Sequence, residues 1–455
     1  MTKGIVVAGL AGGSGKSVVA VGLIAALARQ GKRVAPFKKG PDYIDAGWMK
    51  LAAGHNCYNL DPYLMDEEVI QASFRTQCVG ADIAILEGNR GLYDGVNPEG
   101  GYSTAELSLL LDLPILLVVN CTKTTRTVAA MVLGCTKLDE RIDIRGVVLN
   151  QIGTKRHQSI VTQAVEKYTG IPVLGAVPRM KRDIFPMRHL GVTPHQEYEG
   201  SEDAMDLLAE TATEHLDLDR ILEVMTEIPL LEEKKKSGKR KEKLRIGLLV
   251  DAAFQFYYSE NLEALEEAGA ELVAINALEE ECLPPLDGLY IGGGFPETSA
   301  KFLAANTSFR NSVKDAAENG LPIYAECGGL IYLGESIEFD GEVYPLAGVF
   351  PIRFGMSPKP QAHGYSVFVA EGDNPFYAQG QEVKGHEFRY STILDWRGQT
   401  ADLALKMTRG TGFSEGRDGL TTKNVLALYT HVHTLGTPAW AQGFMKRCRG
   451  LRTRQ

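Results

Sequence analysis

Residues 9–17 have the composition and spacing of a loop that binds phosphate groups. The apolar stretch Gly4–Gly9 predicts a buried strand that leads into this loop, and Lys16–Gln30 predicts the helix that follows it. Glycines let the backbone turn its N–H groups toward a phosphate, while a lysine and a serine at the helix start can reach the terminal phosphates and a Mg²⁺ ion. The residues expected at a bound nucleotide are Gly12, Gly13, Ser14, Gly15, Lys16 and Ser17.

The spacing of this loop is a variant. The common G-x-x-x-x-G-K-[ST] pattern needs a glycine where this chain has Leu10, and the observed spacing is G-x-x-x-G-x-G-K-S starting at Gly9. Partition-type ATPases carry a second lysine at the position of Ala11, so the loop more closely resembles the dethiobiotin-synthetase branch, whose members phosphorylate small carboxylates. A nucleotide-switched assembly protein of the partition type is therefore the less favoured alternative.

Two acidic segments follow the next strands that the sequence predicts. Residues 38–45 come after the strand Arg33–Lys38, and residues 87–95 come after the strand Ala81–Glu87. Parallel strands present their carboxyl ends at one edge of a sheet, and carboxylates beside a phosphate loop are natural ligands of Mg²⁺. We therefore predict that Asp42 and Glu87 join Ser17 at a Mg²⁺ ion, with solvated turn residues as the alternative.

A second chemical centre is predicted at Cys327. Residues 321–330 indicate a buried strand, a sharp glycine-rich turn that carries the cysteine, and a helix. A thiol on such a turn is accessible to a substrate, and nearby backbone N–H groups can stabilise an oxyanion. The glycines of residues 292–294 end the preceding predicted strand and can supply another of these donors. The alternative for a lone cysteine is a small buried apolar residue.

A thiolate nucleophile needs a base, and two histidines follow the apolar segment Val425–Leu428. Strand alternation would place His431 and His433 on one face. A His-x-His pair can also bind a metal, but no third ligand stands at a telling spacing. Either His431 or His433 could therefore serve as the base.

The chain of 455 residues is long enough for about two to four domains. A charged run at 232–243 contains no apolar side chain, which predicts an exposed linker at 231–243 between domains 1–230 and 244–455. Before and after it, short apolar strands alternate with helices, which predicts two α/β, doubly wound domains. The net charge of −9 argues against a general nucleic-acid or membrane binder.

The seven scattered cysteines lack a C-x-x-C pair and are typical of a reducing compartment, so we expect a cytoplasmic protein. The first predicted strand starts too early for a signal peptide, and no apolar run approaches the length of a membrane span. The sequence leaves the oligomeric state open, with a homodimer as one alternative.

The order of these motifs along nearly the whole chain resembles the cobyrinate a,c-diamide synthase family. The shared segments are the phosphate loop, GPDYID at 40–45, EGNRGLYDG at 87–95, HLG at 189–191, GGGFPE at 292–297, AECGGL at 325–330, GHEF at 385–388 and the two late histidines. The family joins a dethiobiotin-synthetase-like phosphate-loop domain to a class I glutamine amidotransferase domain.

This resemblance implies a carbon–nitrogen ligase that uses ATP, Mg²⁺ and glutamine to amidate a tetrapyrrole polycarboxylate. The acetate side chains a and c of cobyrinate would be activated as acyl phosphates and attacked by ammonia. The resemblance makes Cys327 the glutaminase nucleophile and Asn150 an adenine-contacting residue. Relatives amidate sirohaem or nickel-sirohydrochlorin with the same chemistry, which is the alternative, and a kinase or ligase with a redundant thiol domain is a further one.

The chain departs from the expected pattern at three places. Class I glutaminases carry His-Pro-Glu, in which the glutamate orients the base, whereas this chain, aligned on His431, has His433 at the glutamate position. His431 is therefore the preferred base and His433 the alternative, and the group that orients His431 is unidentified from the sequence. Arg389 stands where relatives have a histidine, and Thr193 with residues 195–197 also differs, in regions expected near the tetrapyrrole.

Overall fold

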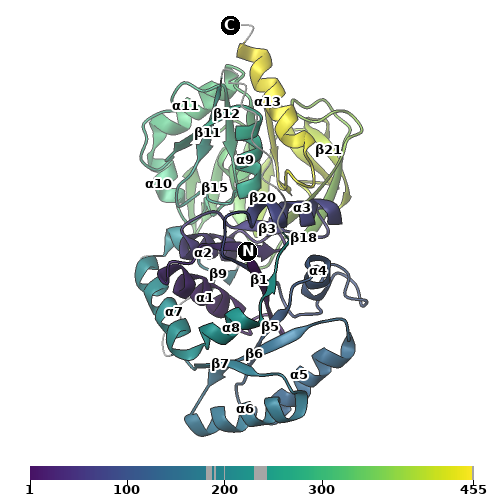
Figure 1. The fold of residues 1–455 in the computed structure, drawn as a ribbon. Helices are drawn as coiled ribbons and strands as arrows, with labels where there is room; N and C mark the ends of the chain where they lie inside the picture. Colours follow the sequence, from purple (N-terminus) through teal and green to yellow (C-terminus); the bar gives the residue numbers. More distant parts are fainter. Residues whose placement is uncertain (181–186, 189–190, 199, 230–242, 453–455) are drawn as a thin grey trace. The chain divides into compact units, whose positions relative to one another are not determined.

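A computed structural model describes residues 1–180, 187–188, 191–198, 200–229 and 243–452 (Figure 1). The chain forms two compact units, Met1–Lys236 (unit 1) and Ser237–Gln455 (unit 2). Residues 231–242 of the predicted linker, and His189 and Leu190 of the HLG motif, lie outside the described residues.

Unit 1 is built on a mainly parallel sheet with the strand order β3-β2-β4-β1-β5-β6-β7, to which β10 adds antiparallel to β1. Its strands are β1 Lys3–Gly9, β2 Val34–Lys39, β3 Tyr58–Leu60, β4 Ile83–Glu87, β5 Ile115–Asn120, β6 Ile144–Ile152, β7 Val173–Pro178 and β10 Thr226–Glu227, with a separate pair β8 Met187–Arg188 and β9 Gly191–Val192. Its helices are α1 Lys16–Arg29, α2 Ile44–Ala53, α3 Glu67–Gln77, α4 Thr104–Leu111, α5 Thr127–Leu138, α6 Lys155–Thr169, α7 Ser201–His215 and α8 Leu218–Val224, with a 3₁₀ turn η1 His195–Glu197.

Both faces of this sheet are buried, which explains why its strands are continuous apolar runs. Ile5, Val6 and Val7 are consecutive in β1, point to alternate faces and are each fully buried. One face packs against α1, α2, α7 and α8 in a single apolar cluster. The other strands predicted in unit 1 lie within a few residues of their expected positions.

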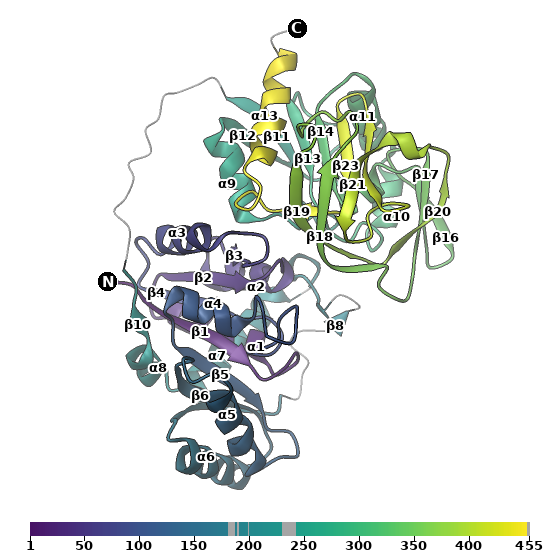
Figure 2. The same cartoon turned by 90° about the vertical axis from the view of Figure 1, so that its right-hand side faces the viewer.

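Unit 2 contains a ten-stranded sheet with the order β12-β11-β13-β14-β23-β22-β21-β18-β19-β24, and a smaller sheet with the order β16-β15-β17-β20 (Figure 2). The strands are β11 Leu244–Leu249, β12 Ala270–Ile275, β13 Gly288–Ile291, β14 Ile323–Glu326, β15 Ser336–Phe339, β16 Glu342–Pro345, β17 Ile352–Met356, β18 Ala362–Ala370, β19 Glu382–Arg389, β20 Ser391–Trp396, β21 Leu403–Arg409, β22 Arg417–Thr422, β23 Val425–Leu428 and β24 His431–Val432. The helices are α9 Ser259–Glu267, α10 Ala300–Ala305, α11 Thr307–Glu318, α12 Gly328–Tyr332 and α13 Ala439–Arg452, with a 3₁₀ turn η2 Thr400–Asp402.

The larger sheet changes character along its length. The pairs from β12 to β23 are parallel, and the remaining pairs from β23 to β24 are antiparallel. The parallel half carries α10, α11 and α12 on one face and α9 with α13 on the other. The prediction of two α/β domains is confirmed, and the alternating polar and apolar residues of the final third correspond to the antiparallel strands.

Candidate active site

The phosphate loop of unit 1 joins β1 to α1 in a conformation that requires glycine. Gly13 and Gly15 have φ angles of +75° and +92°, in the left-handed region. A Cβ atom added to Gly12 or Gly13 would meet no atom within 4 Å, so these two positions border open space. The Ser14 hydroxyl donates to the Ala11 carbonyl at 2.9 Å, and the Lys16 ammonium donates to the same oxygen at 3.3 Å. These contacts hold the curve of the loop and keep the ammonium beside it.

Asn150 supports this loop from β6. Its amide Nδ2 donates to the Ser14 carbonyl at 3.0 Å, and its Oδ1 accepts from the Gln151 N–H at 2.9 Å. A Cβ atom on Gly15 would lie 1.9 Å from that Nδ2. The two residues therefore fit together only because Gly15 has no side chain.

Ser17 and Glu87, which the sequence predicted at one ion, are in direct contact. The Ser17 hydroxyl donates to Glu87 Oε1 at 2.8 Å, and the same oxygen lies 3.1 Å from the ammonium of Lys38. Lys38 also pairs with Asp45 Oδ2 at 2.7 Å. Glu87 is fully buried, and its burial raises its pKa to about 7. Burial alone would lower the pKa of Lys38, but Asp45 and Glu87 outweigh it and raise that pKa above its ordinary value.

Asp42 has a different local arrangement. Its Oδ1 accepts from the backbone N–H groups of Ile44 and Asp45 at 2.9 and 3.1 Å, at the start of α2. Asp45, three positions later in the same GPDYID segment, is the acid that pairs with Lys38 beside Glu87. Glu87 Oε2 is buried and has no hydrogen-bond partner among the described residues, so it remains available to a ligand.

In unit 2, Cys327 lies on the sharp turn that the sequence predicted between β14 and α12. Its backbone has φ +45° and ψ −94°, an unusual conformation for a residue other than glycine. The neighbouring glycines are needed because a Cβ on Gly328 would approach the backbone nitrogen of Gly294 to 2.9 Å. The turn that carries the thiol thus packs directly against the glycine-rich turn after β13, where the sequence placed a second oxyanion donor.

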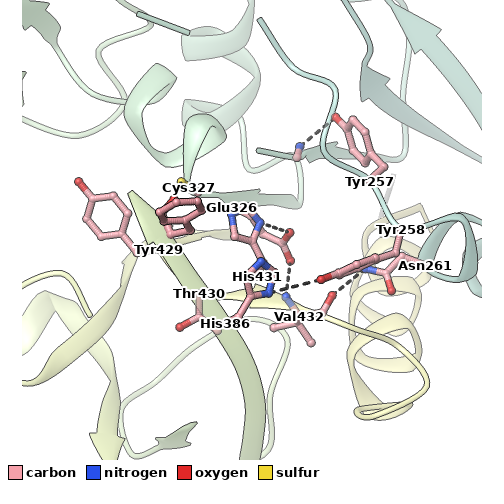
Figure 3. Close-up of polar contacts among 12 residues, drawn as sticks. Tyr257, Tyr258, Asn261, Glu326, Cys327, His386, Tyr429, Thr430, His431 and Val432 are labelled. Carbon is pink, nitrogen blue, oxygen red and sulfur yellow. Dashed lines mark hydrogen bonds and ion pairs between the residues drawn. The ribbon is translucent and has the colours of Figure 1, made fainter. Parts of the chain in front are cut away.

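His431 is the histidine that reaches this thiol. Its Nδ1 lies 3.4 Å from Glu326 Oε2 (Figure 3). Burial alone would lower the pKa of His431, but the contacts with Cys327 and Glu326 outweigh it and raise the pKa to about 10. The imidazole is therefore held in its protonated form at neutral pH, as the partner of a thiolate would be.

His433 has separate surroundings. The strand β24 ends at Val432, so the alternation that would place both histidines on one face does not extend to His433. His433 Nε2 lies 3.6 Å from Glu260 Oε2, and its ring packs against that of Tyr258 with centroids 4.4 Å apart. The two histidines thus face different carboxylates.

A third histidine, His386 of the GHEF segment, lies against His431. His386 on β19 is paired with His431 on β24, and the two rings are stacked at 4.9 Å with 21° between their planes. Burial, together with the nearby His431, holds the pKa of His386 well below its usual range. His386 is therefore neutral and leaves the positive charge on His431.

Comparisons with known proteins identify both units. A family model described as a CobQ/CobB/MinD/ParA nucleotide binding domain matches residues 5–191, and one described as a CobB/CobQ-like glutamine amidotransferase domain matches residues 245–439. The chain is 42% identical to the cobyrinate a,c-diamide synthase of Magnetococcus marinus, over 94% of this chain and 93% of that protein. It is 40% identical to the enzyme of that name from Archaeoglobus fulgidus, over 97% of each chain, and 41% identical to that from Dehalococcoides mccartyi strain CBDB1, again over 97% of each.

The chain belongs to the cobyrinate a,c-diamide synthase family. The resemblance that the motif order indicated is thereby confirmed, and membership makes the chain a glutamine-dependent amidating ligase with a nucleotide-binding domain. In this family's terms, the loop with Lys16 belongs to the nucleotide-binding domain and Cys327 to the amidotransferase domain. Among the described residues, no helix combines the length and apolar character needed to cross a membrane.

Two residues at these sites were not selected from the sequence. Asp45 follows Asp42 by three positions, and the signal that could have found it is its place in the same GPDYID segment. Glu326 directly precedes Cys327, but its partner His431 lies 105 residues further along the chain, and no spacing rule connects the two.

Proposed function

We propose that the chain amidates the a and c acetate side chains of cobyrinate, with ATP and glutamine as co-substrates. The observation that carries this proposal is the near-full-length similarity to proteins named cobyrinate a,c-diamide synthase, at 37–42% identity. The interaction of Cys327 with His431, which raises the pKa of the imidazole, supports its glutaminase half. The same amidation of sirohaem or nickel-sirohydrochlorin is the alternative that an assay must separate. We also propose that the protein is cytoplasmic, with a homodimer as one alternative for its oligomeric state.

In the synthetase half, phosphorylation of the substrate carboxylate would create an acyl phosphate, because hydroxide is a poor leaving group and phosphate a good one. The loop glycines and Ser14 would surround the phosphates of ATP, and the Lys16 ammonium would neutralise charge on the transferred group. Asn150 would keep the loop in shape through its bond to Ser14, next to the base of the nucleotide.

Ser17, Glu87 and Asp42 would hold a Mg²⁺ ion at this site. Their oxygens are the hard ligands that Mg²⁺ prefers, and the buried, unpartnered Oε2 of Glu87 fits such an ion. When bound, the ion would neutralise the phosphate charges of ATP. Lys38 would keep Glu87 in place by its ion pair.

In the glutaminase half, the Cys327 thiolate beside the His431 imidazolium would attack the glutamine carbonyl carbon. The imidazolium would give its proton to the amide nitrogen as the C–N bond breaks and ammonia leaves. Water would then hydrolyse the thioester to release glutamate, and the thiol proton would return to His431. The turns at Gly328 and Gly294 are close enough to place two backbone N–H groups around the developing oxyanion. Ammonia released inside a protein remains unprotonated, whereas in neutral water most of it becomes ammonium.

The test uses purified protein with ATP, Mg²⁺ and glutamine, and mass spectrometry counts the amides added to cobyrinate, sirohydrochlorin and sirohaem. We expect two amides on cobyrinate. The Cys327→Ala variant should lose glutamine-dependent turnover while keeping ammonia-dependent turnover, and Cys282→Ala, which removes an exposed thiol, should keep both. No mass gain with any of the three substrates would overturn the tetrapyrrole proposal, and gain only on a sirohaem-type substrate would select the alternative.

A further inference from the structure

The buried carboxylate of Glu326 is the acid in contact with His431. The residue two positions after His431, where class I glutaminases carry a glutamate, is His433, and it faces Glu260 instead. Glu326 comes from another part of the chain: it is the last residue of β14, immediately before the nucleophile. One strand end therefore presents both the thiol and the acid.

Three groups fix this carboxylate. Oε2 lies 3.4 Å from His431 Nδ1 and accepts from the Tyr290 hydroxyl at 3.3 Å. Oε1 accepts from the backbone N–H of Val432 at 3.2 Å. Glu326 is fully buried, and the Val432 contact ties it to the backbone next to the histidine as well as to the ring (Figure 3). A buried carboxylate with both oxygens bound has little freedom to move.

We propose that Glu326 is the positioning residue for His431, in place of the glutamate that the class I pattern puts after the base. The carboxylate accepts from Nδ1–H, which fixes the tautomer and leaves Nε2 for the thiol of Cys327. When the thiol S–H bond breaks, the electron pair stays on sulfur and the proton binds Nε2, so the site becomes thiolate, imidazolium and carboxylate with no net change in charge. The inference rests on the proposed glutaminase role of Cys327.

The other ionisable residues around His431 do not position its ring through Nδ1. His386 stacks on the ring from β19 and is neutral because of its burial. Tyr290, on β13, reaches Glu326 rather than the histidine. Glu260, on α9, pairs with His433 at 3.6 Å. Among the described residues, Glu326 is the carboxylate with a hydrogen bond to His431.

The main test compares Glu326→Gln with Glu260→Gln, a matched change at a second buried glutamate that faces a histidine. Glutamate released from glutamine gives kcat and KM. For Glu326→Gln we expect kcat to fall by about 100-fold or more with KM within about two-fold, because orienting acids act on the proton transfer and not on substrate binding. Glu260→Gln should stay within about two-fold of the wild type. Glu326→Asp, which keeps the charge, should recover part of the loss.

A second readout separates positioning from mere structural support. The alkylation rate of Cys327 by iodoacetamide, followed by peptide mass spectrometry as a function of pH, reports the thiolate fraction, and exposed Cys282 serves as an internal reference. Without the carboxylate, the imidazolium is less stable, so the alkylation of Cys327 should shift to higher pH in Glu326→Gln. A purely structural glutamate would leave that pH profile unchanged.

The outcomes are distinct. Hydrogen exchange of peptides from β14 and β23 shows whether unit 2 is folded in Glu326→Gln. If it is not folded, Tyr290→Phe removes one donor to the carboxylate and should lower kcat by about three-fold to ten-fold. If Glu326→Gln is folded and its kcat and its alkylation profile are unchanged, the inference is wrong. If Glu326→Gln does not fold, the same unchanged values in Tyr290→Phe would overturn it. Glutaminase activity that survives in Cys327→Ala would instead overturn the proposed function itself.

Discussion

The close approach of Gly15 and Asn150 predicts that substitutions at these two positions are not additive. An alanine at position 15 would carry a Cβ only 1.9 Å from Asn150 Nδ2, so the amide must move and release the Ser14 carbonyl. Alanine at a φ of +92° costs about 1–2 kcal/mol of strain, and a buried carbonyl without its partner costs about 1–3 kcal/mol. We therefore expect Gly15→Ala to lower the free energy of unfolding of unit 1 by about 2–5 kcal/mol.

Asn150→Ala alone removes the same hydrogen bond and should cost about 1–3 kcal/mol. In the double variant, the bond is lost once and the clash disappears, so Gly15→Ala should then add only its strain of about 1–2 kcal/mol. The coupling free energy between the two substitutions is therefore expected to be about 1–3 kcal/mol.

Gly13→Ala is the matched control, because Gly13 also has a positive φ but a Cβ there would meet no atom within 4 Å. Its cost should be about 1–2 kcal/mol and equal with and without Asn150. Urea unfolding read by hydrogen exchange of peptides from β1 and β6 measures unit 1 alone. If Gly15→Ala costs the same in both backgrounds, the reasoning from this contact is wrong.

Three further predictions concern charged groups. Lys38→Met leaves two acids without their cation, so it should cost unit 1 about 3–5 kcal/mol in urea unfolding, whereas Met at the exposed Lys32 should change it by less than about 0.5 kcal/mol. His431→Gln should lower glutaminase kcat by about 100-fold or more, and a larger fall in His433→Gln would reverse the choice of base. Because the folded pKa of His431 is about 10, above the ordinary histidine value of 6.5, its contribution to the stability of unit 2 is complete below pH 6.5 and is lost as the pH rises toward 10. The loss of stability of unit 2 between pH 6.5 and 10, measured from urea midpoints, should be smaller in Cys327→Ala because one cause of the raised pKa is removed. An equal loss in the variant and the wild type would contradict this prediction.

The sequence predicted the architecture well where local patterns carry the information. Continuous apolar runs such as Gly4–Gly9 and Pro114–Asn120 correspond to β1 and β5, because a strand buried on both faces must be apolar throughout. The strand β3 was missed since its three residues, Tyr58–Leu60, are too short to show a period. At the sites, the strand–turn–helix signals located Lys16 and Cys327.

The remaining features depend on contacts between distant residues. Asn150 was selected as a contact for the adenine, and its bond to Ser14, 136 residues away, is invisible in local sequence. Likewise, the sequence pattern alone cannot decide whether Asp42 or Asp45 lies beside Glu87, because both acids are in the GPDYID segment. The position of Lys38, which pairs with Asp45, distinguishes them in the structure. A polar side chain's partner is set by the fold, whereas its presence in a loop is set by composition.

The strand order of unit 2 has a consequence for when the proposed glutaminase site can form. Cys327 follows β14, His431 lies on β24, and between them the ladder runs through β23, β22, β21, β18 and β19. The contact between His431 and Glu326 closes this arc over a separation of 105 residues, and such long loops are costly to close early in folding. We therefore expect the thiol and the imidazole to pair late in folding. If Cys327 acts as proposed, incompletely folded chains, including those still emerging from a ribosome, should carry an ordinary cysteine that does not hydrolyse glutamine.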